Sequence, residues 1–349
     1  MTDGVGILQH AVYSIPDRNH GYCIDDNARA LMVAVRRDDD QSAALAPTFA
    51  AFIQHGWNRD ERRFRNFMGY DRLWLESYGS EDSNGRTLWA LGMAAARSRS
   101  PEIRDWALQL FEEAAPLANE LGAPRAKAFA ALGGLELLNA GSSLELASWL
   151  VEQSTDQLLR LQDHYARDEW GWFEPELAYD NARLPEVLIR GGMMLGDDAL
   201  IDRGLAALAW LTSHQTGPRG NFRPVGCHGF CRPYASPLAF DQQPVEAVAA
   251  IDAAAAAFDA TGDANWQRIA GHAFAWFFGD NDAGVPLADA RTGGCFDGLM
   301  ATGINRNQGA ESILALQLAA LTMREGFAGR NWAGQEEGRA AETRPIAAA

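Results

Sequence analysis

Carboxylate side chains recur in this sequence at the start of one helix-forming stretch after another. The phrase Asp-Asn-Ala-Arg begins at Asp26 and again at Asp180, and the related Ser-Asn-Gly-Arg begins at Ser83. Asp241 comes shortly before a further stretch of this kind. Two carboxylates across a cleft, one protonated and one ionised, are the minimal machinery for cleaving a glycosidic bond. We therefore predict an acid/base pair drawn from these three aspartates.

Helix capping is the competing explanation for these carboxylates. Asp and Asn at a helix N-terminus accept hydrogen bonds from free backbone N–H groups and interact well with the helix dipole. Capping alone does not explain why the same segments also carry tryptophans and arginines. The residues predicted to bind substrate around the acid/base pair are His20, Tyr22, Asp25, Arg29, Trp74, Glu81, Asp82, Arg86, Trp170, Trp172, Glu174, Arg183, His228, Gln242, Asp297, Asn307 and Glu311.

The aromatic and basic members of this set each have two interpretations. Aromatic rings such as those of Trp170 and Trp172 can stack on sugar rings, or they can close the end of the fold and pack its hairpins. Arg29, Arg86 and Arg183 follow an Asn by two residues. They suit a substrate carboxylate or phosphate, but buried charges need partners, which favours pairing with the nearby carboxylates.

The elements that position these residues follow from a long-period repeat. Each polar opening runs into an almost wholly apolar helix, and a second helix with a charged face follows it. Such a period indicates stacked helical hairpins, with the apolar helices inside and the half-polar helices outside. Six inner helices predict an all-α fold, an (α/α)6 toroid. Five outer helices are visible, and a twelfth helix would come from either end of the chain or be absent.

The repeat also predicts the domain limits and the position of the site. It runs without a linker, so we expect one toroid over residues 1–326 and a disordered tail over 327–349. The openings should share one rim, and the short turns of the opposite rim should leave it shallow. Residues 58–82 and 165–180 alternate aromatic and polar side chains, which predicts short β-hairpins in the rim loops.

Composition excludes several classes of partner. The formal net charge is −16, with 30 basic against 46 acidic residues, which excludes a nucleic-acid partner. Neither a basic segment followed by an apolar one at the N-terminus nor a long uncharged apolar stretch is present, so we expect a soluble, cytoplasmic protein without membrane contact. The four cysteines are too few for a disulfide scaffold.

Cysteine placement gives the only metal signal. Cys23, Cys227, Cys231 and Cys295 precede helices that are neighbours in a closed ring, and with His228 they have the ligand types that zinc takes. The C-x3-C spacing is not a zinc signature, and free cysteines are common as small buried side chains. We therefore predict no metal and no cofactor.

Several segments resemble a known family. HGYCIDDNARAL, YDNARLPEVLI, FDQQPVEA and GGCFDGL followed by NRNQGAES are similar to the helical region that accompanies group 1 glycosyltransferases in bacteria. The overall repeat resembles the six-hairpin glycosidase superfamily, whose fold hosts hydrolases, lyases, epimerases and binding proteins. Neither resemblance assigns a catalytic residue. The chain lacks the alternating strand and helix signals of a nucleotide-sugar-binding domain, so it should not itself be a glycosyltransferase of that type.

Three functional hypotheses remain open. The first is a glycoside hydrolase that acts on an oligosaccharide through a carboxylate pair. The second is a sugar epimerase or isomerase, which needs a base such as His10, His20 or His228 next to a substrate carbonyl. The third is a non-catalytic carbohydrate-binding partner of a glycosyltransferase, which needs the aromatic residues but no carboxylate pair.

Overall fold

The structure, a computed structural model, describes residues 1–37 and 39–327, and these residues form 11 α-helices. The helices are α1 (Ile24–Arg36), α2 (Asp40–Gly56), α3 (Glu81–Arg97), α4 (Pro101–Ala114), α5 (Pro124–Asn139), α6 (Glu145–Tyr165), α7 (Arg183–Leu195), α8 (Asp198–His214), α9 (Pro244–Thr261), α10 (Ala264–Trp276) and α11 (Ala310–Phe327). No twelfth α-helix is present in this part of the chain. The predicted tail lies outside the described residues, apart from Phe327, which ends α11. None of the described helices is both long and apolar enough to span a membrane.

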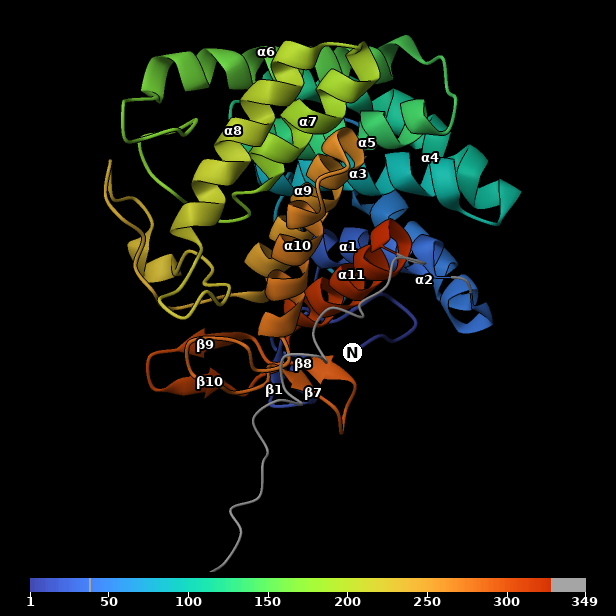
Figure 1. The fold of residues 1–349 in the computed structure, drawn as a ribbon. Helices are drawn as coiled ribbons and strands as arrows, with labels where there is room; N and C mark the ends of the chain where they lie inside the picture. Colours follow the sequence, from blue (N-terminus) through green and yellow to red (C-terminus); the bar gives the residue numbers. More distant parts are fainter. Residues whose placement is uncertain (38, 328–349) are drawn as a thin grey trace, which may run out of the picture.

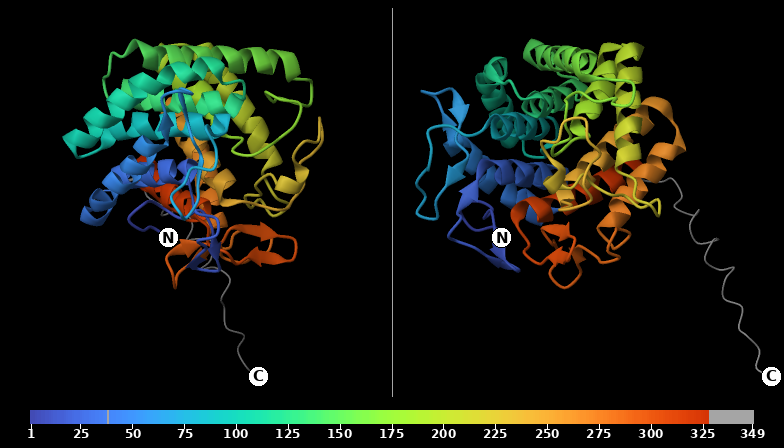
Figure 2. Two further views of the ribbon diagram at one scale, coloured as in Figure 1. Left: turned by 180° about the vertical axis from the view of Figure 1, so that it is seen from behind. Right: turned by 90° about the vertical axis from the view of Figure 1, so that its left-hand side faces the viewer.

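The odd-numbered helices form a closed inner ring. Each contacts the next odd-numbered helix along the chain, and α11 returns to contact α1. Every even-numbered helix packs outside the inner helix that precedes it. Figures 1 and 2 show the colours passing round the ring from blue to red, so that the two ends of the helical region lie side by side. The fold is the predicted (α/α)6 toroid.

Small residues let the inner helices approach one another closely. Gly92 of α3 faces Gly133 of α5, and a Cβ atom on either glycine would collide with the backbone of the other helix. Alanine serves the same purpose in α9, where Ala247, Ala253 and Ala257 are fully buried. Such contacts leave the inner helices apolar on most sides, as the sequence predicts.

Short strands are confined to the segments that precede the inner helices. Five antiparallel pairs form: β1 (Ala11–Val12) with β2 (Ile15–Pro16), β3 (Tyr22–Cys23) with β6 (Phe67–Met68), β4 (Trp57–Asn58) with β5 (Arg63–Phe64), β7 (Ala288–Asp289) with β8 (Gly294–Cys295), and β9 (Gly298–Met300) with β10 (Gly303–Asn305). The β4–β5 pair confirms the hairpin predicted in residues 58–82. Residues 165–180 contain only a bridge between Arg167 and Trp170.

Candidate active site

A cavity of about 330 Å³ opens where α1 and α11 begin and where the chain enters α9. We call it the mouth cavity. Its charged and titratable lining residues are His10, Cys23, Asp25, Asp26, Arg29, Asp241, Asp297 and Glu311, and its other lining residues are Gln9, Asn66, Phe67, Gln243, Asn305, Gly309 and Ser312. Five carboxylates thus meet one arginine in a single cavity.

The asparagine of the repeated motif fastens the loops around this mouth. The Asn27 side chain accepts from the backbone N–H of Ile7 at 3.0 Å and donates to the carbonyl of Cys23 at 2.8 Å. Asn84 repeats both contacts, with the N–H of Phe64 at 2.7 Å and the carbonyl of Ser80 at 2.8 Å. The motif therefore tethers each incoming segment to the helix that follows it.

Asp26, Asp180 and Asp241 do not cap the helices that they begin or precede. The N-cap residue of α1 makes no side-chain capping hydrogen bond. The first N–H groups of α1, at Ile24 and Asp25, donate instead to the Asn66 side chain at 3.0 and 3.3 Å. The side chains of the N-cap residues of α7 and α9 also accept no hydrogen bond from the helix backbone. Capping therefore does not account for Asp26, Asp180 or Asp241.

Asp26 is buried between a thiol and a guanidinium group. Its Oδ1 accepts from Arg29 at 3.0 Å, and its Oδ2 accepts from the Cys23 thiol at 3.1 Å. Arg29 also donates to Glu311 at 2.8 Å. Burial outweighs the attraction of Arg29 and raises the pKa of Asp26 to about 6. This carboxyl can therefore exchange a proton near neutral pH.

Asp241 enters the same cavity from the segment before α9. Its Oδ1 is buried and has no hydrogen-bond partner among the described residues. Burial raises the pKa of Asp241, and the nearby His228 opposes that shift. Gly298 leaves room for the carboxyl, because a Cβ atom there would lie 3.0 Å from Oδ1 of Asp241.

The third predicted catalytic residue, Asp180, does not line the mouth cavity. It is fully buried, with Oδ2 3.3 Å from both terminal nitrogens of Arg86 and Oδ1 3.2 Å from Nε of Arg183. Arg86 reaches back to the cavity, where its Nε donates to Asp25 at 3.0 Å. The arginines pack over Phe129 and Trp89, respectively. Asp180 is therefore part of a structural network beneath the cavity.

Apart from Tyr22 and the three tryptophans, the predicted substrate-binding residues divide into three groups. Asp25, Arg29, Asp297 and Glu311 line the mouth cavity, and Arg86 contacts one of them. Six others do not line the cavity and bind elsewhere in the protein. Glu81 accepts from the N–H groups of Gly122 and Ala123, Asp82 accepts from the Tyr179 hydroxyl, and Glu174 accepts from Arg125. Gln242 accepts from Trp276, Asn307 accepts from the N–H of Tyr13, and Arg183 forms an ion pair with Asp180. His20 and His228 are exposed and do not line the cavity.

The aromatic residues in the set are structural. Trp172 is fully buried and stacks on Trp210 at 5.7 Å, and Trp170 meets the same ring edge-on at 4.9 Å. Trp74 packs against Phe52, and Tyr22 donates its hydroxyl to Asp3. None of them lines the mouth cavity. These rings therefore pack the protein interior rather than offering a surface on which a sugar could stack.

The predicted catalytic and substrate-binding residues did not include the lining residues Gln9, Asn66, Phe67, Gln243, Asn305, Gly309 and Ser312. Asn66 and Phe67 reach the site because β6 pairs with β3, which puts Phe67 opposite Cys23. The alternation of aromatic and polar side chains in residues 58–82 predicts a hairpin, but it does not show that a strand of this segment pairs with β3. Phe67 is 39% exposed, so it offers the cavity an aromatic face that the buried tryptophans do not.

The cysteines do not gather into a metal site. No group of three or more His, Cys, Asp or Glu side chains in the described residues could hold a metal ion. All four cysteines are free thiols, with Cys23 and Cys295 buried, Cys227 partly buried and Cys231 exposed. The zinc alternative considered from the sequence therefore has no support in the described structure.

Comparison with known proteins shows a shared fold. A sugar epimerase from a ruminal bacterium superposes with a TM-score of 0.70 and 14% identity, over 95% of this chain and 94% of that one. Cellobiose 2-epimerase from Spirochaeta thermophila gives 0.67 and 14%, over 91% and 90%. The GH76 α-mannanase of Bacteroides thetaiotaomicron gives 0.60 and 12%, over 88% and 87%. No family model matches the sequence, and no curated protein matches it. The chain therefore shares the six-hairpin glycosidase-like fold.

Proposed function

We propose that the chain is a carbohydrate-active enzyme, and specifically a glycoside hydrolase that acts on an oligosaccharide in the mouth cavity. The observation that carries the proposal is that Asp26 and Asp241 line the same cavity. They enter one cavity from different segments, and burial raises the pKa of each. Carboxyls tuned in this way act as general acids and bases in glycoside hydrolysis. The solved structures of the same fold include both a mannanase and sugar epimerases.

Their surroundings suggest different roles for the two carboxyls. Asp241 has no arginine partner among the described residues and has a free Oδ1, which suits a protonated acid that donates to the glycosidic oxygen. Asp26 keeps Arg29 at 3.0 Å, which stabilises its carboxylate. Above about pH 6 it can accept a proton from the attacking water. In this scheme the bond between the anomeric carbon and the leaving oxygen breaks as water forms the new bond.

The charge of the cavity favours a cationic transition state. Five carboxylates and one arginine line it. Burial, with a smaller contribution from His20, lowers the pKa of His10 and leaves it neutral near pH 7. Glycoside cleavage develops positive charge on the sugar ring, which this excess of carboxylates stabilises. Removal of a proton next to a carbonyl develops negative charge on the substrate, which the same side chains disfavour.

His10 supports a sugar epimerase or isomerase as the second candidate. A neutral imidazole is a suitable base, and His10 lines the cavity with His20 edge-on at 4.7 Å. An epimerase would use this histidine to take the proton from the carbon next to the substrate carbonyl. The candidate therefore depends on His10 rather than on Asp241.

Product analysis separates these functions. Manno-, gluco- and galacto-linked oligosaccharides are incubated with the protein in deuterated water, and new reducing ends and C–D bonds are followed by NMR. Hydrolysis creates reducing ends without carbon deuteration, and the first anomer formed shows whether configuration is inverted. Deuterium at the carbon next to the carbonyl, lost in His10→Gln, would establish the epimerase instead. Saturable sugar binding without turnover would favour the non-catalytic partner of a glycosyltransferase.

A further inference from the structure

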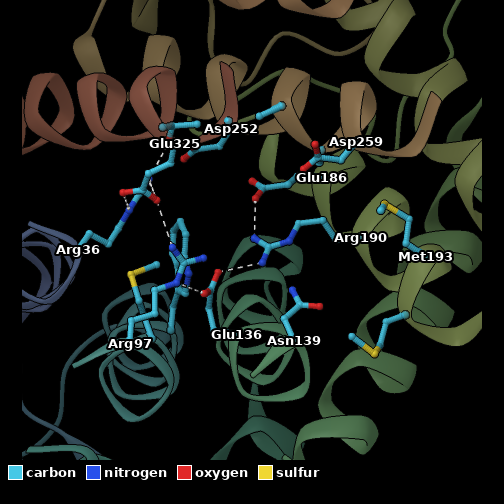
Figure 3. A pocket seen from close by; sticks show the side chains of 17 residues that line it. Arg36, Arg97, Glu136, Asn139, Glu186, Arg190, Met193, Asp252, Asp259 and Glu325 are labelled. Carbon is cyan, nitrogen blue, oxygen red and sulfur yellow. Dashed lines mark hydrogen bonds and ion pairs between the residues drawn. The ribbon is translucent and has the colours of Figure 1, made fainter. Parts of the chain in front are cut away.

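A second cavity lies at the end of the toroid opposite the mouth cavity, where α1 and α11 end. It has a volume of about 540 Å³ and is lined by residues of all six inner helices, from Arg36 of α1 to Glu325 of α11. We call it the base cavity, and Figure 3 shows it from close by. The expectation of a shallow rim at this end is wrong, because long side chains of the inner helices surround an open space.

The charged side chains of the base cavity pair with one another. Arg97 of α3 binds Glu136 of α5 at 2.7 Å, and Arg190 of α7 binds the same carboxylate at 2.8 Å. Arg36 of α1 and Glu325 of α11 pair at 3.1 Å where the ring closes. These contacts join neighbouring inner helices, which accounts for the charged side chains there without a ligand.

The mouth cavity, in contrast, contains an aromatic ring without a ring partner. Phe67 lines this cavity and is 39% exposed, and no aromatic ring or cation among the described residues stacks on it. Other rings of the same region have such partners, since Tyr22 stacks on Tyr70 and Trp74 packs against Phe52. A single exposed apolar side chain is common on a protein surface. The position of Phe67 therefore decides whether its ring has a role.

The register of β3 and β6 places the Phe67 side chain next to the proposed base. Phe67 is directly opposite Cys23, so the two side chains extend from the same face with Cβ atoms roughly 5 Å apart. The Cys23 thiol donates to Asp26 at 3.1 Å. All three side chains line the cavity, whereas Met68, the next residue of β6, is buried on the other face. The ring of Phe67 therefore flanks Asp26 inside the mouth cavity.

Hydrogen bonds hold the backbone beneath this ring in place. The N–H groups of Asn66 and Phe67 donate to the same Glu76 oxygen at 2.8 and 3.1 Å. The Phe67 carbonyl accepts from the N–H of Leu75 at 2.9 Å. An aromatic side chain has only two torsions, so on a fixed backbone it loses little conformational entropy when a ligand covers it.

An aromatic face beside several carboxylates matches the two kinds of surface on a pyranose. A sugar ring carries hydroxyl groups round its edge, which donate to carboxylates, and C–H groups on its faces, which pack on an aromatic ring. Oδ2 of Asp297 and Oε1 of Glu311 accept no hydrogen bond from the described residues, and both side chains line the cavity. The excess of carboxylates repels an acidic sugar. The cavity therefore suits a neutral sugar ring.

We propose that Phe67 binds substrate, by stacking its ring on a face of the sugar whose glycosidic bond Asp26 and Asp241 cleave. The proposal rests on the proposed function for that bond cleavage, but the binding itself needs no turnover. Phe67 forms and breaks no bond. Its loss weakens the ground state and the transition state alike, so it raises KM and leaves kcat nearly unchanged.

Calorimetric titration in an Asp241→Asn background measures sugar binding without turnover. Cellotriose, mannotriose and galactotriose are the probes, and we expect saturable binding of at least one of them. Phe67→Ala and Phe67→Leu should each weaken this binding about tenfold, because neither side chain has a flat face. Phe67→Tyr keeps that face and should stay within about twofold of the background. A purely structural role would make Leu, which is also apolar, at least as good a replacement as Tyr.

Tyr78→Ala is the matched control. It removes an exposed ring from the same loop, outside the cavity, and should leave the affinity unchanged. Equal affinities of Phe67→Ala and its background for a sugar that binds, or no saturable binding of any probe, would overturn the proposal. Binding that depends on Phe67, in a protein with Asp241 intact that releases no reducing ends, would retain it and overturn the hydrolase assignment instead. Melting temperatures show that each variant is folded.

Discussion

The thiol of Cys23 donates a hydrogen bond to Oδ2 of Asp26 at 3.1 Å, and both side chains line the mouth cavity. A thiol is a weak donor, so it stabilises the carboxylate less than a hydroxyl or an amide would. Burial is the largest influence on the pKa of Asp26, and this hydrogen bond opposes it. Cys23 is therefore a positioning residue for the proposed base.

Replacement of Cys23 should change the pH dependence of activity. In the proposed hydrolase, kcat/KM rises with pH as Asp26 ionises, with a midpoint near its pKa of about 6. Cys23→Ala removes a hydrogen bond to the carboxylate and should move this midpoint to higher pH by roughly half a unit to one unit. Cys23→Ser keeps a donor and should leave the midpoint unchanged or lower it. Equal midpoints in the Ala variant and the parent would contradict the role of this contact.

Asp241→Asn should separate activity from stability. Loss of a general acid lowers kcat by roughly 10²–10⁴-fold. The free energy of unfolding should stay the same or rise, because the buried Oδ1 of Asp241 has no partner to lose within the described residues. Turnover and urea denaturation of the same preparation give both quantities. Asp60→Asn, at an exposed position in the loop between α2 and α3, serves as the control and should change neither.

Glu246 should make the folded state less stable as pH rises. It is buried at the start of α9, where Oε2 accepts from Asn181 at 3.0 Å and from Gln215 at 3.2 Å, while Oε1 has no partner in the described structure. Burial raises the pKa of Glu246 to about 7, from an ordinary value of 4.5. The folded state therefore holds its proton more tightly than the unfolded state between these values. The free energy of unfolding falls across that range as pH rises.

Glu246→Gln tests this linkage. The variant mimics the neutral carboxyl at every pH, so its stability should be higher than that of the parent at pH 8 by about 1 to 3 kcal/mol. At pH 4 the two proteins should be equally stable. Urea denaturation at both values measures the difference. A constant difference across the range would mean that the substitution acts through packing alone.

The fold could be predicted from sequence because its cause is local and repeated. The alternation of apolar and half-polar helices determines which helices face inward, and the repeat gives the number of inner helices. The paired strands β7–β8 and β9–β10 could not be predicted in the same way. Each strand has only two or three residues and depends on contacts across the loop from Leu287 to Gln308.

The site could be predicted only in part, because helix starts do not determine depth along the toroid axis. Asp26 and Asp180 share one motif, yet Asp26 faces the mouth cavity and Asp180 turns beneath it with a φ of 52°. Asp26 lies in the first turn of α1, whereas Asp180 precedes α7 and binds both Arg183 of that helix and Arg86 of α3.

Arg86 should be one of the most costly single residues to remove from the toroid. It joins Asp25 and Asp180 and lies over Phe129, with a side chain only 3% exposed. Arg86→Ala leaves the fully buried Asp180 with one arginine instead of two, and should lower the free energy of unfolding by about 3 to 5 kcal/mol. Asp180→Asn in the Arg86→Ala background should restore part of that loss, because it removes the uncompensated charge. Arg160→Ala breaks an exposed pair with Asp156 and should cost less than about 1 kcal/mol. Urea denaturation of the parent, Arg86→Ala, Asp180→Asn and the double variant completes the cycle. Strictly additive effects of the two substitutions would show that the two charges do not depend on each other.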